Sequence, residues 1–352
     1  SVKGDKPRYP EPNLSYLRLL SDDTGVIQHA LYGVPNRPTG YTTDDNARAL
    51  LVAIQEYERT GCRQALADAA NYLAFLYHAL TPDNYFHNLM SYDRRWIDAR
   101  GSEDSHGRAL WAAGYVAGSA APPEIRRAAR QVFEDAVPWA RSLRSLRAIA
   151  FSMMGVAYYS RQWPESPVIA GLPERLSIQL LAAYQRHRSD EWRWFENALT
   201  YSNGMLPHAL LRGYELTGNE QCRDVAREAL EFLTEILVVD GVLQPIGCHG
   251  WYARGGTRAW FDQQPVDVMG MVLLYLTAAR IFQDERYQEL ATLSLDWFFG
   301  RNALGQVMVN PETGACYDGL TPEGVNGNQG AESQTAYLLA HLAMVRAGLA
   351  PS

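Results

Sequence analysis

The stretch Val268-Met-Gly-Met-Val-Leu-Leu-Tyr-Leu-Thr-Ala-Ala279 contains no charged residue and is long enough for about three turns of helix. A helix without a polar face has to be covered by other parts of the protein on all sides. We therefore predict a buried helix over this stretch. Other segments are apolar around nearly their whole circumference and are predicted to be buried in the same way: 47–54, 109–117, 148–157, 209–216 and 336–345.

A second kind of segment is amphipathic. In 220–237, for example, Val225 and Ala229 fall on an apolar face, whereas Arg223 and Arg227 fall on a charged one. Apolar residues at this spacing are typical of a helix with one face on the core and one in solvent. The amphipathic segments are 63–80, 123–143, 173–188, 220–237 and 284–299, and a short helix near 14–20 precedes them.

The two kinds of helix alternate along the chain, outer then inner, which predicts an all-α fold: an (α/α)6 toroid of six inner and six outer helices. A weak internal repeat agrees, because Arg-Ala-Leu begins at both Arg48 and Arg108, and related triplets begin at Arg147 and His208. An open α-solenoid would show more regular repeat lengths. No change in composition divides the chain, so we expect a single domain over 1–352.

Composition argues against several classes of partner. The net charge is −7, and acids and bases are mixed along the same helices, which disfavours nucleic acid. The apolar stretches are too short or too interrupted to span a bilayer, so we expect no membrane. The four cysteines lack metal-ligand or disulfide spacing, and we expect a cytoplasmic protein with no metal and no cofactor. The start, Ser1 to Gly4, shows no signal pattern and is expected to be a trimmed end.

Polar residues gather immediately before the apolar runs of the inner helices. In a toroid these helices enter from one face, so their first turns converge on one cleft. Any single residue here could be a helix cap, and Thr43 and Ser102 are plausible N-caps. Capping does not explain why acids are doubled beside such apolar helices, because burying like charges together is costly. The carboxylates that we predict to be catalytic are Asp44, Asp45, Asp104 and Glu332.

Glycoside hydrolysis fits this pattern. The reaction needs one carboxyl that is protonated as general acid and a second that is ionised as base or nucleophile. Glu332 stands alone near the start of a predicted helix, where the positive dipole end favours an ionised carboxylate, and we predict that it is the base. Asp104 and Asp45 each have an acidic neighbour, and one of them is predicted to donate the proton.

Further residues of the connecting segments and helix starts are predicted to bind the sugar. Aromatic faces pack against the apolar face of a pyranose ring. The predicted platforms are Trp96, Tyr201, Trp251 and Trp260. The predicted polar contacts are Arg48, Glu103, His106, Arg108, Arg147, Glu196, Asn197, His208, His249, Gln264, Asp267 and Asn328.

Several motifs together resemble a bacterial family of (α/α)6 glycosidase-like domains. These are Ser21-Asp-Asp-Thr-Gly25, Gly40-Tyr-Thr-Thr-Asp-Asp-Asn-Ala-Arg-Ala-Leu50, Glu103-Asp-Ser-His-Gly-Arg-Ala-Leu-Trp111 and Gly330-Ala-Glu-Ser333. The resemblance covers nearly the whole chain. It implies the toroid and a polysaccharide context, and some members of the family are linked to retaining-type glycosyltransferases, which implies such a partner. It assigns no substrate and no catalytic pair.

The prediction is therefore a glycoside hydrolase acting on an oligo- or polysaccharide, without a metal. One alternative is a non-catalytic glycan-binding or scaffold domain that works with a glycosyltransferase. A sugar epimerase would use two histidines across the cleft, His106 with His208 or His249. A polysaccharide lyase would use a Tyr or His base, with arginines such as Arg48 or Arg108 holding a uronic acid.

Overall fold

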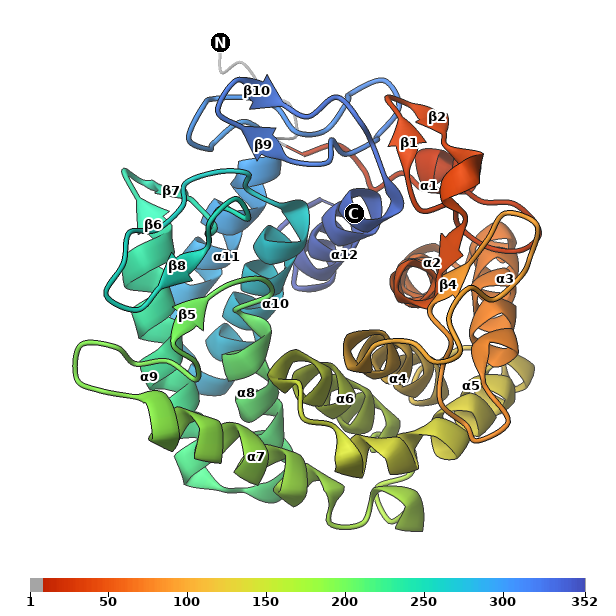
Figure 1. The fold of residues 1–352 in the computed structure, drawn as a ribbon, viewed down its shortest axis with the longest axis horizontal. Coiled ribbons are helices and arrows are strands. Elements are labelled where there is room, and N and C mark those ends of the chain that lie inside the picture. Colours follow the sequence, from red (N-terminus) through yellow and green to blue (C-terminus); the bar gives the residue numbers. More distant parts are fainter. Residues whose placement is uncertain (1–8, 352) are drawn as a thin grey trace.

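The computed structural model describes residues 9–351, and these form a ring of inner helices surrounded by outer helices (Figure 1). The predicted (α/α)6 toroid is confirmed. The inner helices are α2 (Thr43–Thr60), α4 (Glu103–Ala117), α6 (Leu146–Tyr159), α8 (Met205–Thr217), α10 (Pro265–Phe282) and α12 (Ala331–Arg346). The outer helices are α1 (Ser15–Leu19), α3 (Arg63–Ala79), α5 (Pro123–Ala136), α7 (Leu172–His187), α9 (Glu220–Leu237) and α11 (Glu285–Leu295).

Two outer helices are shorter than the sequence predicts. The segment 123–143 divides into α5 and the 3-10 helix η2 (Val137–Ser142), because Pro138 offers no N–H to continue the α-helical ladder. The segment 284–299 divides likewise into α11 and η4 (Asp296–Phe298). The remaining 3-10 helices are η1 (Arg37–Thr39) and η3 (Pro167–Ile169).

Two inner helices approach each other backbone to backbone. A Cβ atom added to Gly114 of α4 would lie 2.3 Å from the carbonyl oxygen of Gly155 of α6. A Cβ atom added to Gly155 would lie 2.3 Å from the carbonyl oxygen of Leu110. The contact between α4 and α6 therefore depends on the absence of side chains at both positions.

The inner helix α10 is longer than the apolar run from which it was predicted. By length and composition it could span a membrane, and 67% of the relevant window is buried inside the protein. That burial is the expected state of an inner helix of the ring.

The long connections before the inner helices form short antiparallel strand pairs. β3 (Tyr41–Thr42) pairs with β4 (Leu89–Met90), and β5 (Ala198–Leu199) pairs with β8 (Tyr252–Ala253). These pairs join connections that are far apart in sequence, so they fix the positions of the loops around one end of the ring. The other pairs are local hairpins: β1 (Ala30–Leu31) with β2 (Val34–Pro35), β6 (Val238–Val239) with β7 (Val242–Leu243), and β9 (Leu320–Thr321) with β10 (Gly324–Val325).

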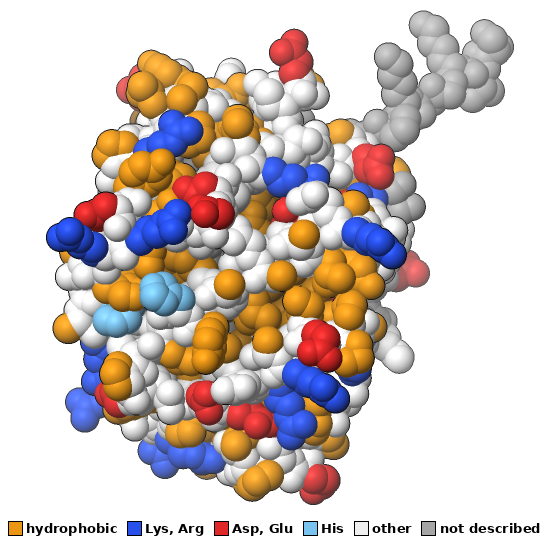
Figure 2. Space-filling model, turned by 90° about the vertical axis from the view of Figure 1, so that its right-hand side faces the viewer, with side chains coloured by type: hydrophobic (Ala, Val, Ile, Leu, Met, Phe, Trp, Pro, Cys, Tyr) orange, Lys and Arg blue, Asp and Glu red, His pale blue; other side chains and the backbone are white. Residues whose placement is uncertain are grey.

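Acidic and basic side chains are interspersed on the side of the molecule that Figure 2 draws, with apolar side chains between them. This side therefore presents no broad field of a single sign.

Candidate active site

A cleft lies where the first turns of α2, α4, α10 and α12 meet. It consists of two adjoining cavities of about 270 and 300 Å³ that share four lining residues, Asp44, Arg48, Gln264 and Glu332. The convergence of these helix starts is the arrangement that the sequence predicts. Further predicted residues that line the cleft are Asp45, Asp104, Arg108, Tyr201, Trp251 and Asp267.

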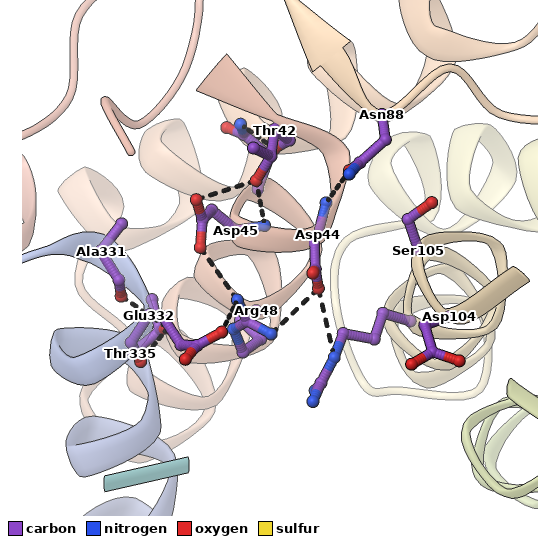
Figure 3. A network of polar contacts seen from close by, with 12 residues as sticks. Thr42, Asp44, Asp45, Arg48, Asn88, Asp104, Ser105, Ala331, Glu332 and Thr335 are labelled. Carbon is purple, nitrogen blue, oxygen red and sulfur yellow. Dashed lines mark hydrogen bonds and ion pairs between the residues drawn. The ribbon is translucent and has the colours of Figure 1, made fainter. Parts of the chain in front are cut away.

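Arg48 of α2 contacts three carboxylates (Figure 3). Its Nη1 lies 3.0 Å from Asp44 Oδ1, and its Nη2 lies 2.9 Å from Asp45 Oδ1 and 3.3 Å from Glu332 Oε2. The guanidinium is almost fully buried, whereas the exposed fraction of its partners' side chains ranges from 4% at Asp45 to 51% at Glu332. Arg48 thus joins the start of α2 to the start of α12.

Asp44 is held by two helices. In addition to Arg48, it pairs at 3.2 Å with Arg108 Nε of α4. The spacing of Asp104 and Arg108 indicates an ion pair within α4, and the structure shows Arg108 paired with Asp44 instead. The N-cap of α2 is likewise Thr42, whose side chain accepts from the Asp45 N–H, and not the predicted Thr43. Ser102 caps α4 as predicted.

Asp45 is an unsuitable proton donor in this geometry. One carboxylate oxygen accepts from Arg48, and the other accepts from the Thr42 hydroxyl at 2.8 Å. Burial raises the pKa of Asp45 to about 6, against the lowering effect of Arg48. Both oxygens are therefore occupied by protein groups, and the side chain anchors Arg48.

The doubled acids at the start of α4 have separate partners. Glu103 accepts hydrogen bonds from the N–H groups of Arg144 and Ser145 at 2.6 and 2.9 Å, so it caps α6 and does not line the cleft. Asp104 lines the cleft and accepts from the hydroxyls of Ser145, at 2.7 Å, and Tyr201. The predicted sugar contact by Glu103 is therefore wrong. Asp104 has an acceptor role toward two hydroxyls, which is unlike that of a proton donor.

Asp267 in the first turn of α10 has the environment of an acid. The residue is 6% exposed, and its Oδ1 accepts from the Ser202 N–H at 2.6 Å. Its Oδ2 is buried and has no hydrogen-bond partner among the described residues. Burial raises the pKa of Asp267 to about 7, with Ser202 opposing that rise. A carboxyl with these properties can stay protonated near neutral pH.

The cleft also contains apolar and neutral polar surface. The rings of Tyr201 and Trp251 lie 6.4 Å apart, at an angle of 47°, on its wall. Gln264, the N-cap residue of α10, lines both cavities. Residues that the sequence reasoning missed come from the connecting loops, where no local pattern marks them. They include Gln28, Asn88, Ser202, Cys248 and Asp318.

Two predicted histidines are not in the cleft. His106 packs against the rings of Tyr85 and Phe86, and its Nε2 lies 3.0 Å from the Ala136 carbonyl oxygen in the outer layer. Burial lowers its pKa to about 4. His208 lines a different cavity, to which the middle and last turns of several inner helices contribute. Contrary to the prediction, neither His106 nor His208 lies where it could contact a sugar in the cleft.

Arg147 and Glu196 support the wall of the cleft without lining it. Arg147 Nη1 pairs with Glu196 at 2.6 Å, and its Nε donates to the Tyr201 carbonyl at 2.7 Å. The Arg147 guanidinium also lies over the Tyr201 ring. The predicted direct contact with sugar is therefore replaced by a role in positioning Tyr201.

The remaining predicted contacts lie outside the two cavities. Trp96 stacks on His87 with ring centroids 4.7 Å apart, and Trp260 lies beneath the guanidinium of Arg258. Two others serve loop structure: the Asn197 carbonyl accepts from the Arg254 N–H, and Asn328 Oδ1 accepts from the Tyr32 N–H. None of these four predicted residues lines the cleft.

Within residues 9–351, one cluster has the composition of a metal site. Cys248, His249 and Asp262 each offer one ligand atom, and these atoms lie within 4.8 Å of one another. Only Cys248 lines the cleft, and His249 is mostly exposed. The predicted substrate contact of His249 therefore stays a prediction at the edge of the site.

Comparison with known proteins gives structural matches only. No protein-family model and no curated protein matches the chain. A cellobiose 2-epimerase from Bacillus thermoamylovorans is 11% identical with a TM-score of 0.74, and the match covers 95% of each chain. A D-mannose isomerase is 14% identical with a TM-score of 0.71, covering 95% of this chain and 94% of the other. An α-1,6-mannanase from Salegentibacter sp. is 11% identical with a TM-score of 0.64, covering 95% and 96%. At these identities the matches establish the toroid, as the sequence resemblance implied.

Proposed function

We propose that this protein is a carbohydrate-active enzyme that hydrolyses glycosidic bonds, with Asp267 as general acid and Glu332 as base. The observation that carries the proposal is the pairing, in one cleft, of a buried carboxyl with a raised pKa and an accessible, ion-paired carboxylate. This is the division of roles that glycoside hydrolysis requires.

Asp267 replaces Asp104 and Asp45 as the proposed proton donor. Asp267 lines the cavity, and its Oδ2 has no hydrogen-bond partner within residues 9–351, so no described group competes with a substrate for its proton. A pKa of about 7 leaves a large fraction of the group protonated at neutral pH. After donation, the Ser202 N–H stabilises the carboxylate that remains.

Glu332 keeps the role of base that the sequence analysis predicts. Its side chain is 51% exposed, and the ion pair that it forms with the described residues is the 3.3 Å contact to Arg48, so it can reach water as well as protein. Asp44, between Arg48 and Arg108, is more tightly held and is proposed to position the substrate. The wall formed by Tyr201 and Trp251 offers apolar faces for a pyranose ring.

A buried polar atom in the cleft also supports a hydroxyl-rich ligand. Arg108 Nη1 is buried and has no hydrogen-bond partner among the described residues. Arg108 lines the same cavity as Asp267. A guanidinium N–H and a protonated carboxyl are both donors, and donors that lack partners are suited to the oxygen atoms of a sugar.

The enzymatic alternatives fit the cleft less well. An epimerase that uses paired histidines would need them in the cleft, and the one histidine lining it within residues 9–351 is the exposed His29. A lyase with Tyr201 as base would need a lowered pKa, and burial together with Asp104 raises the pKa of Tyr201.

The experiment measures reducing ends released from α-1,6-mannan and cello-oligosaccharides, in parallel with isomer formation from cellobiose and mannose. Hydrolysis that Asp267→Asn and Glu332→Gln each reduce by about 10²–10⁴-fold is expected. Asp240→Asn, an exposed change outside the cleft, is the matched control and should retain full activity. Isomer formation without hydrolysis would refute the proposal in favour of an epimerase. Binding of a glycan without turnover would refute it in favour of a scaffold.

A further inference from the structure

A separate cavity, of about 400 Å³, lies toward the other end of the inner helices. Its lining includes Tyr158, Arg280 and Arg346 from the last turns of α6, α10 and α12, whereas the cleft is lined by first turns. The cavity shares no lining residue with the cleft. It is therefore a separate site on the ring.

The charge of this cavity is one-sided. Four arginines line it, Arg161, Arg212, Arg280 and Arg346, and among residues 9–351 no Asp or Glu contributes to its lining. Such a concentration is notable in a chain whose net charge is −7. One-sided charge in a concave site attracts ligands of the opposite sign.

Nearby acids neutralise only part of this charge. Glu215 pairs with both Arg212 and Arg280, so one carboxylate is shared between two guanidiniums. Glu58 borders a neighbouring cavity together with Arg346. Within residues 9–351, no ion pair joins Arg161 or Arg346 to a carboxylate. At least two positive charges are left for a ligand.

Two buried polar atoms on the lining residues also lack partners. His208 is 3% exposed and Arg212 is 7% exposed, and neither His208 Nδ1 nor Arg212 Nε has a hydrogen-bond partner in the described part of the chain. His208 Nε2 lies 2.8 Å from the Thr277 hydroxyl. In the tautomer that accepts from this hydroxyl, Nδ1 carries the ring proton and is a donor. Buried donors without a partner are costly unless a ligand or water meets them.

The rest of the lining is apolar. Trp111, Met154, Leu273, Leu276 and Leu339 contribute to it, and the Tyr158 ring lies 4.6 Å from the Arg161 guanidinium and 5.0 Å from that of Arg212. A few polar groups on a largely apolar wall are typical of a small-molecule site. Arginine forks match the geometry of phosphate oxygens.

We propose that this cavity binds a small organic phosphate monoester, with the phosphate on Arg161 and Arg346 and the organic part on the apolar wall. The two unpaired guanidiniums match the charge of about −2 that a phosphate monoester carries at neutral pH. A carboxylate would neutralise only one of them.

The test is calorimetric titration of the whole protein with phenyl phosphate, at a pH above the second phosphate pKa of about 6. Saturable binding is expected. The double variant Arg161→Gln/Arg346→Gln should weaken it by at least about tenfold, because a hydrogen bond to a charged group contributes about 1.5–3 kcal/mol. Both side chains are exposed, so the variant should fold. The double variant Arg127→Gln/Arg186→Gln removes two exposed arginines elsewhere and should bind like the wild type.

Three results would overturn the proposal. Phenol binding as tightly as phenyl phosphate would show that the anion is irrelevant. Benzoate binding more tightly than phenyl phosphate would assign the site to carboxylates. Phenyl phosphate binding equally to the wild type and to Arg161→Gln/Arg346→Gln, or to none of the proteins, would remove this cavity as the site. The readout is binding, so its failure is independent of the reaction proposed for the cleft.

Discussion

Replacing Asp267 by asparagine should change how stability depends on pH, in a direction that the structure fixes. Burial raises the pKa of Asp267 from its ordinary value of 3.8 to about 7, so the folded protein holds this proton over a range in which the unfolded chain has lost it. This group therefore stabilises the folded state relative to the unfolded state as pH falls, and its contribution to wild-type stability decreases as pH rises from about 4 to 7. Within that window, each unit by which the pH rises lowers the contribution of Asp267 to the free energy of unfolding by about 1.4 kcal/mol.

The amide introduced by Asp267→Asn cannot titrate, so the free energy of unfolding of this variant minus that of the wild type should increase by about 2–3 kcal/mol between pH 5 and 8. Urea denaturation at the two pH values measures this difference, and Asp240→Asn is the control for an exposed carboxylate. Asp45, whose pKa is also raised, remains in both proteins, so its contribution cancels. A difference that is the same at pH 5 and at pH 8 would refute the raised pKa and with it the proposed acid.

Three further outcomes are expected. If Asp267 is the acid, kcat should fall as pH rises through about 7, and a pH profile that keeps rising to pH 9 would contradict this. Gly155→Ala should destabilise the protein by about 1–3 kcal/mol, because its Cβ would lie 2.3 Å from a carbonyl oxygen of α4, whereas Gly270→Ala meets nothing closer than 3.9 Å and is the control for thermal denaturation. Treatment with EDTA should leave activity unchanged. A loss of activity on EDTA treatment that added zinc restores, and that the variant Cys248→Ser does not show, would instead assign a metal to the cluster of Cys248, His249 and Asp262.

The helices could be predicted because their burial is encoded locally. The spacing of apolar residues within one segment distinguishes a helix that is apolar on all sides from an amphipathic helix. The alternation of these two kinds of helix along the chain is compatible with few folds other than the toroid. The carboxylates at the starts of α2, α4 and α12 could be predicted because they stand immediately before the apolar runs of these helices.

Side-chain roles were less predictable, because they depend on partners that are distant in sequence. Asp267 and its partner Ser202 are separated by 65 positions, and no local pattern reveals that the second oxygen is buried without a donor. Glu103 and Asp104 look equivalent in sequence, and only the position of α6 separates the cap from the cleft residue. His208 is predicted to contact the sugar, whereas the structure places it on a separate cavity that shares no described lining residue with the cleft.

The three carboxylates around Arg48 differ in how firmly they are held, and this has a consequence for a reaction cycle. Asp45 is buried, Asp44 has a second guanidinium, and Glu332 has the longest of the three contacts and the most exposed side chain. Glu332 can therefore turn toward a water molecule and take up its proton while Arg48 keeps two anionic neighbours. When Glu332 takes up a proton and becomes neutral, Asp44 and Asp45 still neutralise the buried guanidinium of Arg48. The reaction therefore leaves no unpaired charge in the protein interior.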